Sequence, residues 1–210
     1  MKTVLALSLL FFTSSALAAV VGKDVSYKAG DTVMKGFLAF DDAVKGKRAG
    51  VLVVPEWWGA NDYARKRARM LAGEGYVALV VDMYGNGQTA DNPQDAGALA
   101  GNVNKNPPLA LSRFQAAEKF LKGQPNVKKG EIAALGYCFG GGVVLNMARA
   151  GEPLKAAVTY HGILATDVAV KPGDIKAKLR IFHGEADPVV PPEQVEAFKA
   201  EMDNAKADYM

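Results

Sequence analysis

Short apolar runs alternate with amphipathic segments along most of the chain. Three runs are almost continuously hydrophobic, over Gly50–Pro55, Tyr76–Asp82 and Ile132–Leu135. Two shorter runs, Ala156–Thr159 and Leu179–Phe182, follow the same pattern. Continuous rather than alternating hydrophobicity is typical of strands that are buried on both faces of a sheet. The pattern therefore predicts five buried strands.

Helix-forming segments separate these strands. Helices are predicted over Tyr63–Gly73, Ala110–Leu121, Gly141–Ala150 and Pro192–Asn204. Gly85–Pro108 is rich in Gly, Asn, Asp and Pro, which favours a long loop with room for a short helix. Before the buried strands, Val25–Lys28 and Val33–Phe40 are predicted as two short strands joined by a turn at Gly30-Asp31.

Strands that alternate with helices predict a mostly parallel sheet with helices on both faces, a three-layer α/β fold. Ligands of such sheets bind outside the carboxyl ends of the strands. The residues that follow the five predicted strands are therefore the candidates for a functional site. They are Glu56-Trp57-Trp58, Met83-Tyr84, Cys138, His161 and Asp187.

The first eighteen residues have the layout of a secretory signal peptide. Met1-Lys2 is a short basic start, Val4–Phe12 is nearly all apolar, and Ala16-Leu17-Ala18 supplies a small-residue cleavage site. The apolar run is shorter than the ~20 residues that cross a bilayer, although an uncleaved anchor remains the alternative. We expect a secreted or periplasmic protein with one domain over residues 19–210.

Composition narrows the choice of partners. The net charge is only +3, and no basic stripe is interleaved with aromatic residues, so we expect no nucleic-acid partner. One cysteine and two histidines, widely spaced, do not form a metal-binding pattern. We therefore expect no metal or other cofactor, no stable membrane association, and a monomer that acts on a small molecule.

Gly136-Tyr137-Cys138-Phe139-Gly140 stands between a predicted buried strand and a predicted helix. This is the pattern of a nucleophile elbow with cysteine in place of serine. The helix dipole is expected to favour the thiolate of Cys138, and the N–H of Phe139 is expected to be an oxyanion-hole donor. The alternative is an inert core cysteine beside a tight glycine turn.

Four motifs, in this order along the chain, resemble those of the dienelactone hydrolase family of α/β-hydrolases. They are Pro55–Gly59, Asp82–Gly85, Gly136–Gly141 and His183–Pro191. The resemblance implies the α/β-hydrolase fold and the hydrolysis of small esters, thioesters or lactones. It also implies roles for individual residues: Cys138 as nucleophile, Asp187 as the triad acid, Glu56 as acceptor of the thiol proton, Trp57 as the second oxyanion donor, and Trp58, Tyr84 and His161 as pocket residues.

The sequence departs from the family at the position two residues beyond Tyr84. The family has an arginine there that holds a substrate carboxylate, and this chain has Asn86. Without that charge-assisted anchor, a small neutral ester, thioester or lactone is a better candidate substrate than dienelactone.

A second departure concerns the base. The triad of this fold runs nucleophile, acid, histidine along the chain, but no histidine follows Asp187. Ala207–Tyr209 resembles the opening of the next strand, so we expect that the last strand and its histidine are missing and that turnover is weak or absent. His161 is expected to line the pocket, with a role as the catalytic base as the alternative, and His183 is expected to pin the acid loop by hydrogen bonding. A non-catalytic binding or redox-active thiol protein is the alternative function.

Overall fold

The computed structural model describes residues 20–166 and 168–210. The predicted signal peptide, residues 1–18, lies outside this part of the chain. Within the described residues, no helix combines the length and the apolar character that a membrane crossing requires.

One seven-stranded sheet organises the described residues, with the strand order β1-β2-β4-β3-β5-β6-β7. β1 and β2 form an antiparallel hairpin, β2 pairs antiparallel with β4, and the five strands β3 to β7 run parallel to one another. The strands are β1 (Val20–Ala29), β2 (Thr32–Asp41), β3 (Arg48–Val54), β4 (Val77–Val80), β5 (Val127–Tyr137), β6 (Ala156–Tyr160) and β7 (Lys178–Phe182). The predicted mostly parallel α/β sheet is confirmed.

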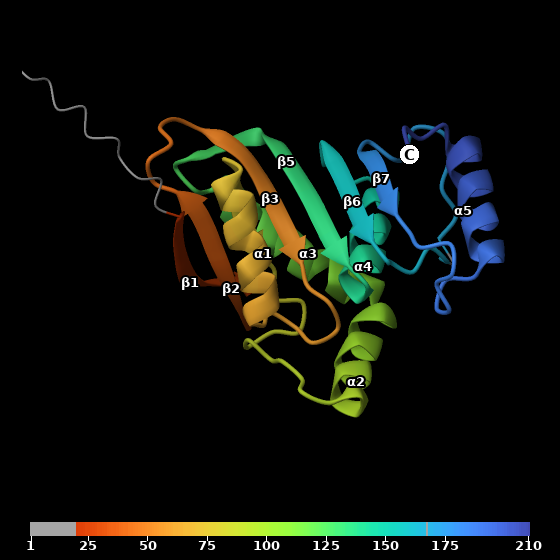
Figure 1. Ribbon diagram of the computed structural model, residues 1–210, viewed down its shortest axis with the longest axis horizontal. Helices are drawn as coiled ribbons and strands as arrows, with labels where there is room; N and C mark the ends of the chain where they lie inside the picture. The colour runs from red at the N-terminus through yellow and green to blue at the C-terminus, as the bar shows by residue number, and fades with distance from the viewer. Residues whose placement is uncertain (1–19, 167) are drawn as a thin grey trace, which may run out of the picture.

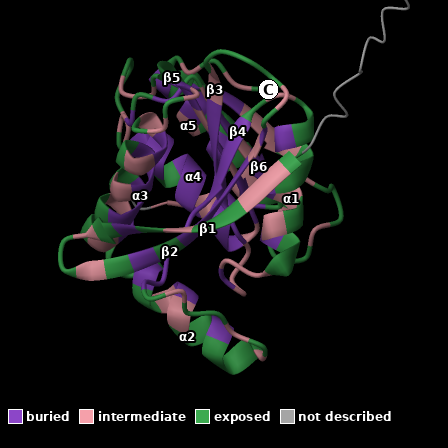
Figure 2. Ribbon diagram, turned by 90° about the vertical axis from the view of Figure 1, so that its left-hand side faces the viewer, coloured by how far each residue is buried: buried purple, intermediate pink, exposed green. Residues whose placement is uncertain are grey.

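Helices lie on both faces of the sheet. Figure 1 shows α1 in front of β3, with α3 and α4 behind the sheet. The buried parts concentrate in the central strands and α4 (Figure 2). The helices are α1 (Asp62–Gly73), α2 (Pro93–Asn104), α3 (Pro107–Lys122), α4 (Phe139–Arg149) and α5 (Pro192–Ala205).

The segment Gly85–Pro108, expected to be a long loop with room for a short helix, contains the twelve-residue helix α2. The Asn92 side chain accepts a hydrogen bond from the Asp95 N–H and caps the helix, and a proline occupies its first position. Proline and asparagine indicated a loop, but at these positions they start a helix. Ala96, Ala100 and Val103 then form its buried face.

The carboxyl ends of four parallel strands place the predicted site residues in one row. Val54 pairs with Gly136, Tyr137 with Tyr160, and Tyr160 with Phe182. Continuing each strand in this register brings Glu56, Cys138, His161 and His183 to neighbouring positions at the edge of the sheet. The backbone bonds Cys138 N–H to Tyr160 O (2.9 Å) and His161 N–H to Phe182 O (3.0 Å) continue the pairing into this row.

The last residues of the chain pair with β7. The Leu179 N–H donates to Asp208 O (2.7 Å) and the Ile181 N–H to Met210 O (2.8 Å), and Tyr209 forms a parallel bridge with Leu179. The predicted strand opening at Ala207–Tyr209 therefore lies where a further parallel strand would begin, and it covers the outer edge of β7.

Arg149 ties three segments together behind the sheet. Its side chain is only 1% exposed and makes a two-pronged ion pair with Glu201 of α5 at 2.8 and 2.7 Å. It also donates to the carbonyl oxygen of Leu164, at 2.7 Å, in the segment after β6. Truncating one member of a buried, hydrogen-bonded pair leaves the other charge without compensation.

We expect Arg149→Met to lower the free energy of unfolding by about 2–4 kcal/mol, because the Glu201 carboxylate and the Leu164 carbonyl lose their partner. Urea unfolding followed by circular dichroism measures this. Arg180→Met is the matched control, since Arg180 makes an exposed pair with Asp208 and its loss should cost at most about 1 kcal/mol. Equal losses in the two variants would contradict the anchoring role of Arg149.

Candidate functional site

Cys138 occupies a strained turn between β5 and α4. Its φ is 52° and its ψ is −117°, a left-handed region that a side chain disfavours. The turn fits only because Gly136 and Gly140, two residues before and after Cys138, have no side chains. A Cβ on Gly136 would lie 2.1 Å from Gly140 O, and one on Gly140 would lie 2.3 Å from Val54 O. The strand–turn–helix setting predicted for the elbow is therefore present.

The electrostatic surroundings of Cys138 favour the neutral thiol. Burial raises the pKa of Cys138, a hydrogen bond from the Phe139 N–H lowers it by less, and the charges of Glu56 and Asp187 raise it further. The Phe139 N–H at the start of α4 favours the thiolate, as expected of a helix N-terminus, but it does not decide the balance. Desolvation and two nearby carboxylates outweigh the single backbone donor.

Tyr84 holds together the two segments that were predicted to donate to an oxyanion. Its hydroxyl donates to the backbone oxygen of Trp57 at 2.8 Å, and its ring packs 5.6 Å from that of Phe139. Burial, followed by the charge of Cys138, raises the pKa of Tyr84, so this hydroxyl stays a donor. Tyr84 thus links these two segments and does not offer a free hydroxyl to a ligand.

The two tryptophans pack against each other after β3. Their rings meet edge to face with centroids 5.1 Å apart, and both side chains are half-buried. The Trp57 ring contributes to the main core cluster and lies beside Gly97 of α2. Trp57 therefore joins α2 to the end of β3, while Trp58 remains available as a pocket residue.

Asp187 contacts the Nδ1 of His161 through Oδ2, and its Oδ1 accepts hydrogen bonds from Val189 N–H (2.9 Å) and Val190 N–H (3.4 Å). Partial desolvation acts to raise the pKa of Asp187, but the Val189 N–H and His161 outweigh it and hold the pKa below its ordinary value. A carboxylate therefore faces the His161 imidazole. The histidine predicted as a pocket residue lies against the predicted triad acid.

The environments of the two histidines differ. The His161 side chain is 48% exposed, whereas that of His183 is 13% exposed. The Nδ1 of His183 lies 3.8 Å from Asp187 Oδ2, beyond hydrogen-bond range, and has no partner among the described residues. The expectation that His183 pins the acid loop by hydrogen bonding is therefore not met at this nitrogen.

Sequence reasoning missed the role of Asp82. This buried carboxylate accepts backbone N–H bonds from Tyr84 (3.0 Å), Gly85 (2.8 Å), Gly87 (2.9 Å) and Lys35 (2.9 Å). It fixes the loop that carries Tyr84 and joins it to β2. The available signal was an aspartate at a strand end, three residues before the turn Gly85-Asn86-Gly87.

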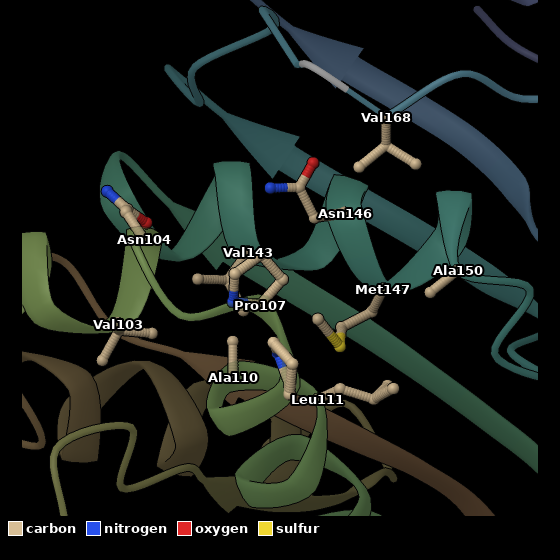
Figure 3. Close-up of a pocket in the computed structure, with 11 residues that line it drawn as sticks. Val103, Asn104, Pro107, Ala110, Leu111, Val143, Asn146, Met147, Ala150 and Val168 are labelled. Carbon is tan, nitrogen blue, oxygen red and sulfur yellow. The ribbon is translucent and has the colours of Figure 1, made fainter.

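An apolar cavity of about 310 Å³ lies between the start of α3 and one face of α4 (Figure 3). A second cavity of about 280 Å³ shares Asn104, Pro107, Asn146 and Val168 with it and reaches Phe139. The described residues contain no cluster of three or more His, Cys, Asp or Glu that could bind a metal ion.

Comparison with known proteins identifies the relatives of this chain. Residues 34–210 match the model of the dienelactone hydrolase family. A putative carboxymethylenebutenolidase from Aquifex aeolicus is 30% identical over 148 residues, which cover 68% of this chain and 62% of that protein. This chain thus spans less than two thirds of the length of that curated relative.

Solved structures agree with this match. The protein m3DLH superimposes with a TM-score of 0.87 and is 35% identical in sequence. P91, a dienelactone hydrolase-like promiscuous phosphotriesterase from metagenomic libraries, superimposes with a TM-score of 0.83 and is 36% identical. Each comparison covers 91% of this chain and 80% of the other. The fold is that of the α/β-hydrolases, and the chain belongs to the dienelactone hydrolase family.

Proposed function

We propose that this protein is a hydrolase in which Cys138 attacks small, neutral esters, thioesters or lactones. The observation that carries the proposal is the setting of Cys138, a half-buried thiol in a strained elbow that receives the Phe139 N–H. Strain of this kind persists only where the surroundings enforce it, and it clusters at active sites. An inert core cysteine has no need of a left-handed backbone.

The first half of the reaction is acyl transfer to sulfur. Glu56 takes the proton of the Cys138 thiol, and the sulfur forms a bond to the substrate carbonyl carbon. The carbonyl electron pair moves onto oxygen, which the Phe139 and Trp57 N–H groups stabilise. When this pair returns, the bond to the leaving group breaks, and the leaving group takes the proton from Glu56. The products are a thioester on Cys138 and the free alcohol or thiol.

His161 and Asp187 serve the second half, which consumes water. With Nδ1 against Asp187, the other ring nitrogen of His161 is directed away from the acid, and the side chain is half exposed. This nitrogen takes a proton from water, whose oxygen attacks the thioester carbonyl. The carbon–sulfur bond then breaks, and His161 returns the proton to sulfur. The carboxylic acid leaves, and Cys138 is again a thiol.

Neutral phosphotriesters form a second candidate substrate class. The observation that favours them is the 36% identity to P91, a dienelactone hydrolase-like promiscuous phosphotriesterase. Asn86 in place of an arginine fits both classes, because neither substrate carries an anion to be held.

The proposal also includes export and a monomeric state, as predicted from the sequence.

Because His161 lies against Asp187, we expect the purified chain to hydrolyse p-nitrophenyl acetate, in place of the weak or absent turnover expected from the sequence alone. Cys138→Ala should lose at least about 100-fold of this activity, since the thioester can no longer form. Release of p-nitrophenol is followed by absorbance, and paraoxon is the substrate that tests phosphotriester hydrolysis in the same assay. Oxidation of Cys138 without cleavage of any of these substrates would support the redox-active thiol instead.

We expect His161→Ala to lower the rate of thioester hydrolysis about 100-fold or more and to leave the initial burst of p-nitrophenol intact, because only water activation is lost. Intact-protein mass spectrometry should then show acetylated Cys138. His183→Ala is the matched control and should retain turnover. Turnover that survives in His161→Ala would contradict the role of His161 as base.

The alkylation of Cys138 by iodoacetamide should depend on pH with a midpoint above that of an ordinary thiol, because the pKa of Cys138 is raised and only the thiolate reacts. Glu56→Gln removes a neighbouring negative charge, so it should lower this midpoint and speed alkylation at neutral pH. Glu185→Gln, in the same acid loop as Asp187, is the charge-matched control. A midpoint that stays fixed in Glu56→Gln would exclude electrostatic contact between Glu56 and Cys138.

A further inference from the structure

We propose that the two adjoining cavities beside α4 form one groove that binds the apolar acyl chain of the substrate while its carbonyl group lies at Cys138. This inference rests on the proposed function and adds the substrate class, namely esters and thioesters of medium-chain acids. We call the surface lined by the two cavities the acyl groove. It is defined by residues of the α2–α3 corner, one face of α4, and the segment that follows β6.

The acyl groove starts one helical turn from the nucleophile. Gly142 and Asn146 line the nearer cavity, and Asn146 and Ala150 line the farther one. These residues follow Cys138 at intervals of four, so they form a ridge along one side of α4. At 1.5 Å per residue the ridge extends about 18 Å from Cys138 to Ala150.

Gly142 leaves space between Cys138 and the groove. This residue has no side chain at the point where the acyl chain of the substrate would extend away from the Cys138 sulfur. A Cβ at this position would make only ordinary van der Waals contact with Ile163, at 3.6 Å. Phe139 borders the same nearer cavity, and its N–H donates to the Cys138 sulfur. Phe139 is therefore shared by the nearer cavity and the surroundings of the Cys138 sulfur.

The lining suits a hydrocarbon chain. Its floor consists of Val103, Ala110, Val143 and Met147, each less than 10% exposed. Figure 3 shows these side chains around the farther cavity, with Asn104 and Asn146 at its borders. The residues that line the two cavities carry no formal charge. An anionic or strongly polar ligand would find no partner on this floor.

The size favours a small molecule over a protein segment. Volumes of about 310 and 280 Å³ are typical of ligand pockets, and the groove ends beside the elbow rather than on an open face. Burying each added methylene of a chain gains up to about fourfold in binding. Reactivity at Cys138 should therefore rise with chain length until the groove is filled.

Alkylation of Cys138 with a series of N-alkyl iodoacetamides, methyl to octyl, tests the groove without requiring turnover. The sulfur forms a bond to the reagent carbon and iodide leaves, so the alkyl tail departs from Cys138 as an acyl chain would. Rates are measured on the full chain by mass spectrometry at the pH of half-ionisation, and each is divided by that of N-acetylcysteine. We expect the octyl reagent to react at least about tenfold faster than the methyl reagent.

Two substitutions on the ridge locate the effect. Asn146→Trp fills the middle of the groove and should reduce the octyl-to-methyl ratio to near one. Ala150→Trp fills only the far end, so it should lower the rate of the octyl reagent and spare that of the butyl reagent. Ala150 is exposed at the end of α4, so this variant keeps the test valid if Asn146→Trp fails to fold. Met70→Trp, exposed on α1 at the other face of the sheet, is the matched control.

An octyl-to-methyl ratio near one in the unaltered chain would overturn the proposal, as would a high ratio that both ridge variants retain. The chain could instead dimerise with increasing concentration, with Asn146→Trp abolishing the dimer and the alkylation rate not depending on tail length. That result would assign the groove to a second copy of the chain and would also overturn the proposal. Failure of the proposed function has a different signature, in which alkylation depends on tail length but no ester is hydrolysed.

Discussion

The close approach of the first turn of α4 to the ends of three strands is the constraint on which the site depends. A Cβ on Gly140 would lie 2.3 Å from Val54 O, and one on Gly141 would lie 2.2 Å from Thr159 Oγ1 and 2.8 Å from Gly162 Cα. Such distances exclude any side chain at these two positions. Because the helix must begin there, the chain turns sharply at Cys138 and takes up a positive φ. The same contacts set the position of Gly142, from which the acyl groove starts.

This constraint also determines the electrostatics of the thiol. The elbow brings Cys138 into the row that contains Glu56, within reach of Asp187, and buries it far enough for desolvation to dominate its pKa. The resting thiol is therefore protonated and a poor nucleophile towards adventitious electrophiles. That property suits the export that we propose for this chain, since a thiolate would oxidise readily. Ionisation must then accompany substrate binding, which is the step proposed for Glu56.

Periodicity predicted the five parallel strands, four of the five helices and the elbow, because continuous apolar runs and flanking glycines are local signals. It could not place α2 within Gly85–Pro108, since Asn92 and Pro93 mark loops and helix starts equally well. Nor could it predict the contact between His161 and Asp187, which arises from residues 26 apart that meet only through strand pairing. The raised pKa of Cys138 was missed for the same reason, because local sequence shows the helix dipole but not the burial.

The positions of Asp82 and Tyr84 explain why a neutral substrate is consistent with the whole site. Asp82 uses both oxygens on four backbone N–H groups, so the loop is held by internal bonds and needs no ligand to order it. The Tyr84 hydroxyl donates its hydrogen bond to Trp57 O. Asn86 follows on an exposed turn and brings no charge to the pocket. With the polar groups of this loop engaged in its own support, binding energy for a substrate must come from apolar contact, and the acyl groove supplies that contact within one helical turn of Cys138.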